Sequence, residues 1–360
     1  MIAAALLLSS LICREDASMS THRLWIGALL LAAVAGAAWY RQSVFQRPPS
    51  SPPPVIVFIT GGSGPYWQQA VDGAKSAADA LTVKLQVETP ADAESSEQQS
   101  ALLKKLDPAA IDGVAISPLN AEGQTQLIND LAKEAFVVTF DSDAPDTDRQ
   151  GYVGTSNFAA GRTCARLLPE ALPQGGKVAV ILANLTKDNL MDRKGGFQEA
   201  LDQLAAKETN PKFEVVDFLV DDGSDERGAE LIRETLAKYD DLACFVGMNA
   251  RHGPLLLKVL KAEDQLGKIK IIAFDDAPAT LDGLAAGHIY ATLAQDPFRY
   301  GYEAVRMLAE LNRADAAYRP VSKTTYSVNV ETLRPDGLEA YRARHSGRTT
   351  AKESKAGQGS

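Results

Sequence analysis

The chain has 360 residues, of which 45% are hydrophobic and 23% are charged, and its formal net charge is -9. This length and composition fit a globular protein of two lobes of ordinary domain size, each with its own buried core. The acidic balance argues against a protein that binds nucleic acid by neutralising its phosphates.

The N-terminal segment predicts export. Residues 24–40 are uncharged, follow a short basic start and contain the small-residue pattern A-x-A at 35–37, which is the layout of a signal sequence. Aromatic residues at both ends of the same stretch fit an uncleaved membrane anchor equally well. Met19 is a second candidate start, and "RPPSSPPP" (47–54) is an extended spacer. We therefore assign residues 1–53 to a signal peptide or membrane anchor plus a Pro-rich spacer.

From Val55 onward, short β-branched runs alternate with longer helical patterns. The predicted strands are 55–60, 83–88, 113–117, 136–140, 177–183, 213–218, 243–248, 269–274 and 289–294. The predicted helices include 66–81, 124–135, 159–168, 197–206, 227–238 and 299–312. Apolar strands separated by helices indicate an α/β fold with parallel sheets covered on both faces. Beyond about Pro335 the composition predicts a disordered tail.

Polar side chains recur where predicted strands end. Asp141 and Ser142 follow "FVVTF", Asn249 follows "ACFVGM", Asp275 and Asp276 follow "IKIIAF", and Gln295 follows "IYATLA". In open α/β sheets, ligands bind outside the carboxyl ends of the strands. These side chains are therefore expected to converge on one crevice.

The glycine-rich turn "TGGSGPYW" (60–67) raises the question of a phosphate site. A dinucleotide fingerprint needs a third glycine where Trp67 stands, and no Gly-Lys-Ser/Thr follows for a phosphate loop. The alternative is a tight turn in which Pro65 starts a helix and Tyr66 and Trp67 offer aromatic faces to a sugar ring. The competing interpretation places at least one of the two aromatics in the core.

The sequence contains few residues in patterns that could support catalysis or bind a metal ion. "GGSGP" misses the nucleophile motif G-x-S-x-G at its last position, and none of the four histidines stands in a base-like pattern. His252 and His288 are expected on the surface. Cys164 and Cys244 lack CxxC spacing and are expected to be buried free thiols rather than a disulfide. We expect no catalytic residue, metal or cofactor.

The acidic stretch "DSDAPDTD" (141–148) lacks the glycine and glutamate that a calcium loop requires. We interpret it as a solvated turn with one functional member, Asp141, whose carboxylate can accept two hydroxyl hydrogen bonds. Arg193 in "MDRKGGF" offers a planar fork that can bridge hydroxyl or ring oxygens; the alternative for it is a surface ion pair. Acids, amides, one arginine and aromatics form a set that binds neutral polyols.

At this point the chain resembles a known family, the type I periplasmic solute-binding proteins of ABC transporters, in the ribose-binding-like branch. The resemblance covers about Pro54 to Arg334. Its motifs occur in order: "GPYWQQAVDGAKSAADAL", "DGVAISP", "VVTFDSDAP", "YVGTSNFAAGR", "DRKGGFQEAL", "FVGMNA", "IIAFDDAP" and "ATLAQDPFRYGYEAV".

The resemblance implies two doubly wound parallel-sheet lobes with a ligand cleft between them and a hinge of three chain crossings, near Ser156, Gln295 and Val321. The lobes would comprise 54–156 with 296–321, and 157–295 with 322–335, followed by a disordered tail at 336–360. It implies a monomer that captures a monosaccharide or related polyol outside the cytoplasm, either secreted or anchored by 24–40, and delivers it to an ABC permease. The implied ligand contacts are Tyr66, Trp67, Asp141, Arg193, Asn249, Asp275 and Gln295.

At two positions the sequence differs from the pattern of ribose binders, and two other functions were considered for the chain. Gly64 and Ser142 stand where ribose binders carry an asparagine and an arginine, so ribose itself is not the expected sugar. A repressor of the lactose-repressor type is disfavoured because a membrane-directing segment and "RPPSSPPP" stand where the DNA-binding helices would be. A membrane-anchored sensing receptor that signals to a kinase or chemoreceptor stays open as the alternative function.

Overall fold

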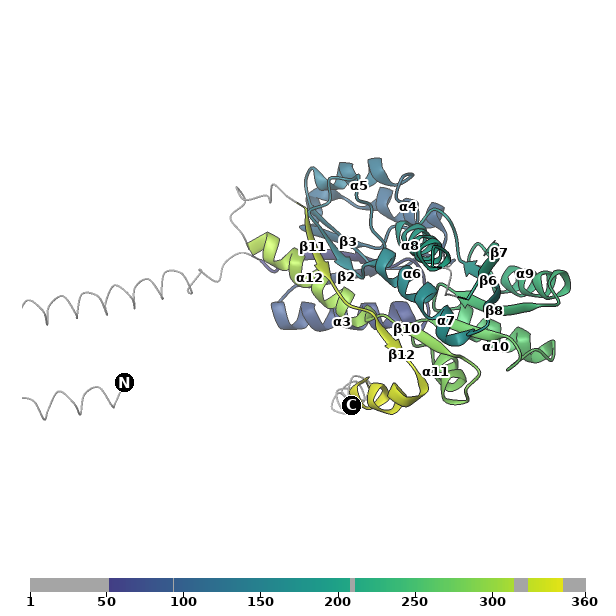
Figure 1. Cartoon of the computed structure of the whole chain (residues 1–360). Helices are drawn as coiled ribbons and strands as arrows, with labels where there is room; N and C mark the ends of the chain where they lie inside the picture. Colours follow the sequence, from purple (N-terminus) through teal and green to yellow (C-terminus); the bar gives the residue numbers. More distant parts are fainter. Residues whose placement is uncertain (1–51, 93, 208–210, 314–322, 346–360) are drawn as a thin grey trace, which may run out of the picture. The chain divides into compact units, whose positions relative to one another are not determined.

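The computed structural model describes residues 52–92, 94–207, 211–313 and 323–345 (Figure 1). The predicted signal or anchor segment, residues 47–51 of the Pro-rich spacer and residues 346–360 of the predicted tail lie outside these ranges. Within them, no helix combines the length and the apolar character needed to cross a membrane.

The first lobe is built on a six-stranded sheet in which every neighbouring pair is parallel. In sheet order its strands are β11 (Thr324–Ser327), β5 (Gly151–Gly154), β4 (Phe136–Phe140), β3 (Gly113–Ile116), β1 (Val55–Ile59) and β2 (Lys84–Glu88). The central strands are almost entirely buried because helices cover both faces.

The second lobe repeats this plan, except that its edge strand β12 runs antiparallel to β10. In sheet order its strands are β12 (Glu331–Leu333), β10 (Ala291–Ala294), β9 (Lys270–Phe274), β8 (Leu242–Gly247), β6 (Gly176–Leu182) and β7 (Phe213–Val220). The predicted α/β fold of two doubly wound lobes is thereby confirmed.

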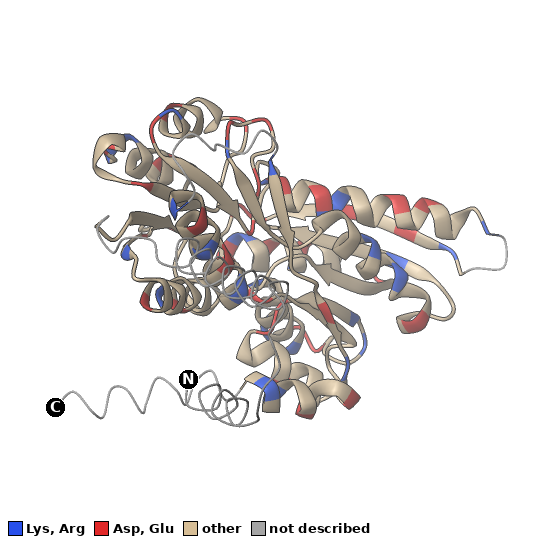
Figure 2. Cartoon of the chain, turned by 90° about the vertical axis from the view of Figure 1, so that its left-hand side faces the viewer, with Lys and Arg blue, Asp and Glu red and all other residues tan. Residues whose placement is uncertain are grey.

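Each sheet lies between two layers of helices. In the first lobe α3 (Pro65–Leu81) and α12 (Pro297–Arg313) cover one face, and α4 (Ser96–Lys105) and α5 (Thr125–Ala132) the other, with a short 3-10 helix at Pro108–Ala110. In the second lobe α6 (Asn157–Arg166), α7 (Leu168–Ala171) and α8 (Asp188–Ala205) face α9 (Asp225–Lys238), α10 (His252–Ala262) and α11 (Pro278–Ala285) across the sheet. Lys and Arg are interspersed with Asp and Glu along the helices in Figure 2.

Glycines allow two pairs of helices to pack backbone to backbone. A Cβ added at Gly73 in α3 would lie 1.8 Å from the carbonyl oxygen of Phe298 in α12. A Cβ at Gly196 in α8 would lie 2.0 Å from the carbonyl oxygen of Phe158 in α6. The first contact fixes α12 to the first lobe, and the second fixes α6 to the second lobe. Each of these helices directly follows a segment in which the chain crosses from one lobe to the other.

The third chain crossing differs from the prediction. The first two lie between β5 and α6 and between β10 and α12, at the predicted places near Ser156 and Gln295. Val321 lies outside the described residues, but β11 pairs with β5 in the first sheet, so the chain returns to the second lobe at 328–330. Residues 324–327 therefore belong to the first lobe, contrary to the predicted boundary. Both final strands are short and polar, which hid them in the sequence.

The predicted disordered tail is wrong for its first part. A 3-10 helix at Pro335–Gly337 leads into helical residues 338–345, where Leu338 and Tyr341 are buried in the second-lobe core. The Tyr341 hydroxyl donates a hydrogen bond to Asp276 Oδ2 over 2.8 Å.

Cys164 and Cys244 are free thiols and are buried, as predicted. Burial raises the pKa of the Cys244 thiol to about 12.

Candidate ligand-binding site

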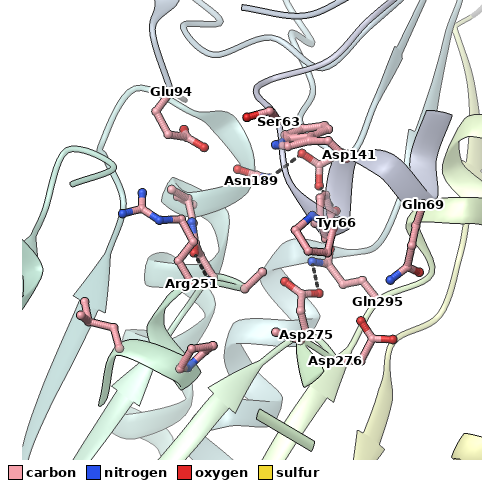
Figure 3. Close-up of a pocket in the computed structure, with 18 of the residues that line it drawn as sticks. Ser63, Tyr66, Gln69, Glu94, Asp141, Asn189, Arg251, Asp275, Asp276 and Gln295 are labelled. Atoms are coloured by element: carbon pink, nitrogen blue, oxygen red, sulfur yellow. Dashed lines mark hydrogen bonds between the residues drawn. The ribbon is translucent and has the colours of Figure 1, made fainter. Parts of the chain in front are cut away.

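A cavity of about 390 Å³ lies between the lobes, where the carboxyl ends of strands from both sheets meet. All seven residues predicted for the site line it, from both lobes: Tyr66, Trp67, Asp141, Arg193, Asn249, Asp275 and Gln295. Figure 3 shows Tyr66, Asp141, Asp275 and Gln295 grouped on one side of this cavity. Its volume falls in the range typical of small-molecule sites.

Asp141 is the first-lobe acid, placed directly after β4 in a left-handed backbone conformation with φ 61°. Its Oδ1 accepts a hydrogen bond from the Tyr66 hydroxyl at 2.5 Å, and its Oδ2 accepts from Ser117 Oγ at 2.9 Å and from Asn189 Nδ2 at 3.4 Å. Burial, and then the Asp141 charge, raise the pKa of Tyr66 well above its usual value, so the phenol stays a donor. Asn189 belongs to the second lobe, so this carboxylate already joins the two lobes.

Asp275 is the second-lobe counterpart, placed directly after β9 with φ 65°. Its Oδ1 accepts from Gln295 Nε2 at 2.8 Å. Burial raises the pKa of this carboxyl to about 7, although the Arg193 charge and the Gln295 hydrogen bond act in the opposite direction. Non-glycine residues in left-handed backbone are costly and concentrate at functional sites. The two acids therefore occupy equivalent strand ends of the two lobes in the same unusual conformation.

Asp275→Asn is expected to stabilise the protein above neutral pH. Because the folded-state pKa is raised from 3.8 to about 7, the native carboxyl keeps a proton that the unfolded chain releases between about pH 4 and 7. This group therefore costs stability progressively as pH rises through that window, by about 4 kcal/mol at most above it. Differential scanning calorimetry at pH 8 should show the variant melting several °C higher, with the difference shrinking toward pH 5.

Asp282→Asn is the matched control, because Asp282 is exposed and pairs with Arg342 at the surface. It should leave the melting temperature unchanged within about 1 °C at every pH, in line with other surface pairs. A melting temperature for Asp275→Asn equal to or below that of the parent at pH 8 would contradict this prediction. It would show that other interactions offset the free-energy cost of burying the Asp275 carboxylate.

Arg193 links three parts of the second lobe and hinge and is 2% exposed, so the surface ion pair considered for it is wrong. Its Nε donates to Asn157 Oδ1 at 2.9 Å, one terminal nitrogen donates to the Met248 carbonyl oxygen at 2.7 Å, and the other to Gln295 Oε1 at 2.9 Å. The guanidinium lies 4.3 Å from the centre of the Phe274 ring. An arginine has five N–H donors, so this framework leaves two of them for a ligand.

The two aromatics of the glycine-rich turn have different positions. Trp67 is 8% exposed and belongs to the first-lobe core, where it packs edge-on against Phe140 with ring centres 6.3 Å apart. A Cβ at Gly61 would lie 2.6 Å from the indole, so this glycine makes room for Trp67. Gly64 has φ 103°, which favours glycine. The core interpretation thus holds for Trp67, although it also lines the cavity together with Tyr66.

Asp276, expected at the crevice, also lines the cavity, whereas Ser142 does not. Several other polar residues of the cavity were not predicted: Ser63, Gln69, Glu94, Asp225, Lys187, Asn189, Arg251 and Lys258. Most lie in loops or first helical turns that carry no apolar periodicity. Asn189 had one usable signal, its place one turn before Arg193 on the same helix. Its Oδ1 is buried and has no hydrogen-bond partner among the described residues.

The expected surface position of His252 is wrong. The expected solvation of the acidic turn holds for Asp146 and Asp148, which are exposed, but not for Asp143. His252 is fully buried, and its Nδ1 accepts from the Met248 N–H at 3.2 Å, so Nε2 carries the proton that faces Asp221 Oδ2 at 3.2 Å. Asp143 is buried and paired with Arg149. Among the described residues, no group of three or more His, Cys, Asp or Glu side chains could hold a metal ion.

Comparison with known proteins agrees with this geometry. Residues 55–315 match the family described as "Periplasmic binding protein domain". The ribose import binding protein of Haemophilus influenzae is 23% identical over 237 residues, which cover 65% of this chain and 76% of that protein.

Two solved structures are similar over most of their length. A solute-binding protein of an ABC transporter from Burkholderia graminis, in complex with D-arabinose, is 28% identical with a TM-score of 0.73 and covers 80% of this chain and 98% of its own. A glucose-galactose binding protein from Geobacillus stearothermophilus is 29% identical with a TM-score of 0.73 and covers 80% and 99%.

Proposed function

Because the chain belongs to the periplasmic binding protein domain family, we propose that it captures a monosaccharide or related polyol between its lobes and delivers it to an ABC permease. The observation that carries the proposal is that the seven predicted polar and aromatic residues all line one interlobe cavity. The relatives named above bind ribose, D-arabinose, or glucose and galactose by their descriptions.

The chemistry of the cavity suits neutral hydroxyl groups. Asp141 and Asp275 supply carboxyl groups from the two lobes, and Asn249 and Arg193 supply donors. Hydrogen bonds to ionised groups are stronger and more directional than neutral ones. Trp67 and Tyr66 offer apolar contact for the C–H side of a sugar ring.

Ligand capture would be a hinge motion at the three chain crossings. A sugar that contacts Asp141 and Asp275 touches both lobes and therefore favours the closed arrangement. Such a protein acts outside the cytoplasm and presents its closed form to a membrane permease. The family relatives support this location and partner class, and the N-terminal apolar segment fits either a secreted or an anchored form.

A sugar panel tests the proposal. D-ribose, D-arabinose, D-allose, D-galactose and D-glucose are each added to the purified chain, and its melting temperature is recorded with leucine as the negative control. A ligand that binds only the folded state raises the melting temperature. At least one sugar should do so and give one-to-one binding by calorimetry, and a panel in which no sugar behaves differently from leucine would contradict the function.

A further inference from the structure

The two lobes contact each other directly along one edge of the cavity, at residues outside the predicted seven. The loop between β6 and α8 supplies Asn184 and Lys187 from the second lobe, and the segment after β2 supplies Glu94 from the first. Asn184 Nδ2 donates to Glu94 Oε2 at 2.8 Å, and Lys187 Nζ lies 3.2 Å from Glu94 Oε1. Both carboxylate oxygens of Glu94 are therefore used across the cleft.

A second pair of contacts runs beside the first. Thr186 Oγ1 donates to the carbonyl oxygen of Leu119 at 3.0 Å, and the Ala121 N–H donates to the carbonyl oxygen of Thr186 at 3.4 Å. Leu119 and Ala121 follow β3 of the first lobe. The second-lobe loop is thus bonded to two separate first-lobe segments.

Local hydrogen bonds and backbone geometry position the residues of this contact. Asn184 Oδ1 accepts from the backbone N–H groups of Thr186 and Lys187 at 3.1 and 3.0 Å, which fixes the loop. Glu94 has φ 63°, a costly backbone conformation for a residue with a side chain. On the second lobe, Gly223 makes room for it, because a Cβ there would lie 2.9 Å from Glu94 Cγ.

The ion pair is shielded from solvent, which separates it from ordinary surface pairs. The Lys187 and Glu94 side chains are 6% and 10% exposed, and the Lys187 ammonium lies 5.6 Å from the centre of the Trp67 ring. Exposed ion pairs contribute little, whereas buried pairs with full hydrogen bonding are sensitive to loss of either partner.

We infer that Glu94, through its bonds to Lys187 and Asn184, is a latch that holds the two lobes closed in the unliganded protein and so raises the affinity of the cavity. The latch adds to the closed state an attraction that does not depend on the sugar. A larger fraction of closed molecules before binding lowers the free energy that the ligand must supply for closure, so the ligand binds more tightly. The affinity part rests on the proposed function, and the closure part does not.

The test measures the distance between the lobes without ligand. Spin labels are attached to cysteines introduced by Ala101→Cys in α4 and Ala237→Cys in α9, two exposed positions. The full chain also carries Cys13→Ser, so the buried Cys164 and Cys244 are the only other thiols. Double electron–electron resonance should show one dominant short distance in the parent. Glu94→Gln and Lys187→Met should each raise the ratio of open to closed molecules about tenfold.

Asp241→Asn is the matched control, since Asp241 forms an exposed pair with Lys177 away from the cavity. It should leave the distance distribution unchanged. Should either latch variant fail to fold, Thr186→Val, which removes the bond to Leu119, decides by the same readout. A parent that is mainly open, latch variants with the parental distribution, or a control that opens equally would overturn the inference.

A second readout separates this inference from the proposed function. Dissociation of the sugar with the largest thermal shift should be about tenfold faster from Glu94→Gln than from the parent, and unchanged within twofold from Asp241→Asn. If no sugar binds, the proposed function fails, and the unliganded distances still decide the latch.

Discussion

Asp141→Asn is expected to weaken sugar binding at least 100-fold, about 2.7 kcal/mol of binding free energy. The carboxylate holds three donors, from Tyr66, Ser117 and Asn189, and an amide nitrogen in place of one oxygen would face donors instead of accepting from them. A sugar hydroxyl would lose a charged acceptor at the same time. Isothermal titration calorimetry with the best sugar of the panel measures the loss.

Asp130→Asn is the control for this variant, because Asp130 lies on the surface of the same lobe and pairs only with exposed neighbours. Its affinity should equal that of the parent within a factor of two. An affinity of Asp141→Asn for the sugar within threefold of the parental affinity would show that Asp141 does not contribute to sugar binding, although it lines the cavity.

Arg193→Met is expected to abolish detectable sugar binding and to destabilise the fold by about 3 to 5 kcal/mol, the range for breaking a buried charged group away from its partners. The change leaves Asn157 Oδ1, the Met248 carbonyl and Gln295 Oε1 without their donor. Two of these acceptors stand at chain crossings, so the hinge itself should loosen. Chemical denaturation followed by circular dichroism measures the stability loss.

Arg233→Met provides the comparison, since Arg233 forms an exposed pair with Glu263. It should cost less than about 1 kcal/mol. Arg193→Lys keeps the charge but cannot reach three acceptors at once, so its stability should fall between those of the parent and Arg193→Met. Parental stability in Arg193→Met would contradict the framework role assigned to this guanidinium.

The sequence predicted the fold and much of the site because both follow from the same local rule. Apolar β-branched runs mark buried parallel strands, and the first polar residue after such a run lies at the carboxyl end of the sheet. Asp141, Asn249, Asp275 and Gln295 were placed in this way, and the structure brings them to one cavity.

Other features could not be predicted because tertiary contacts decide them. Helix α8 begins nine residues before its predicted start, since Gly195 and Gly196 weaken the helical pattern, yet Gly196 is needed for the close approach of α6. His252 beside Gly253 and Pro254 resembles a surface turn, and only the fold shows it buried against Asp221. Glu94 acts through a loop of the other lobe, a partner that no local pattern reveals.

We propose that the interlobe cavity holds a sugar between Asp141 and Asp275. A crystal structure of the protein grown with the sugar that gives the largest thermal shift tests this directly. We expect electron density for one sugar ring in the cavity, with hydroxyl groups within hydrogen-bond distance of both carboxyl groups and the ring beside Tyr66. Density for the sugar elsewhere, with the cavity filled only by water, would contradict it.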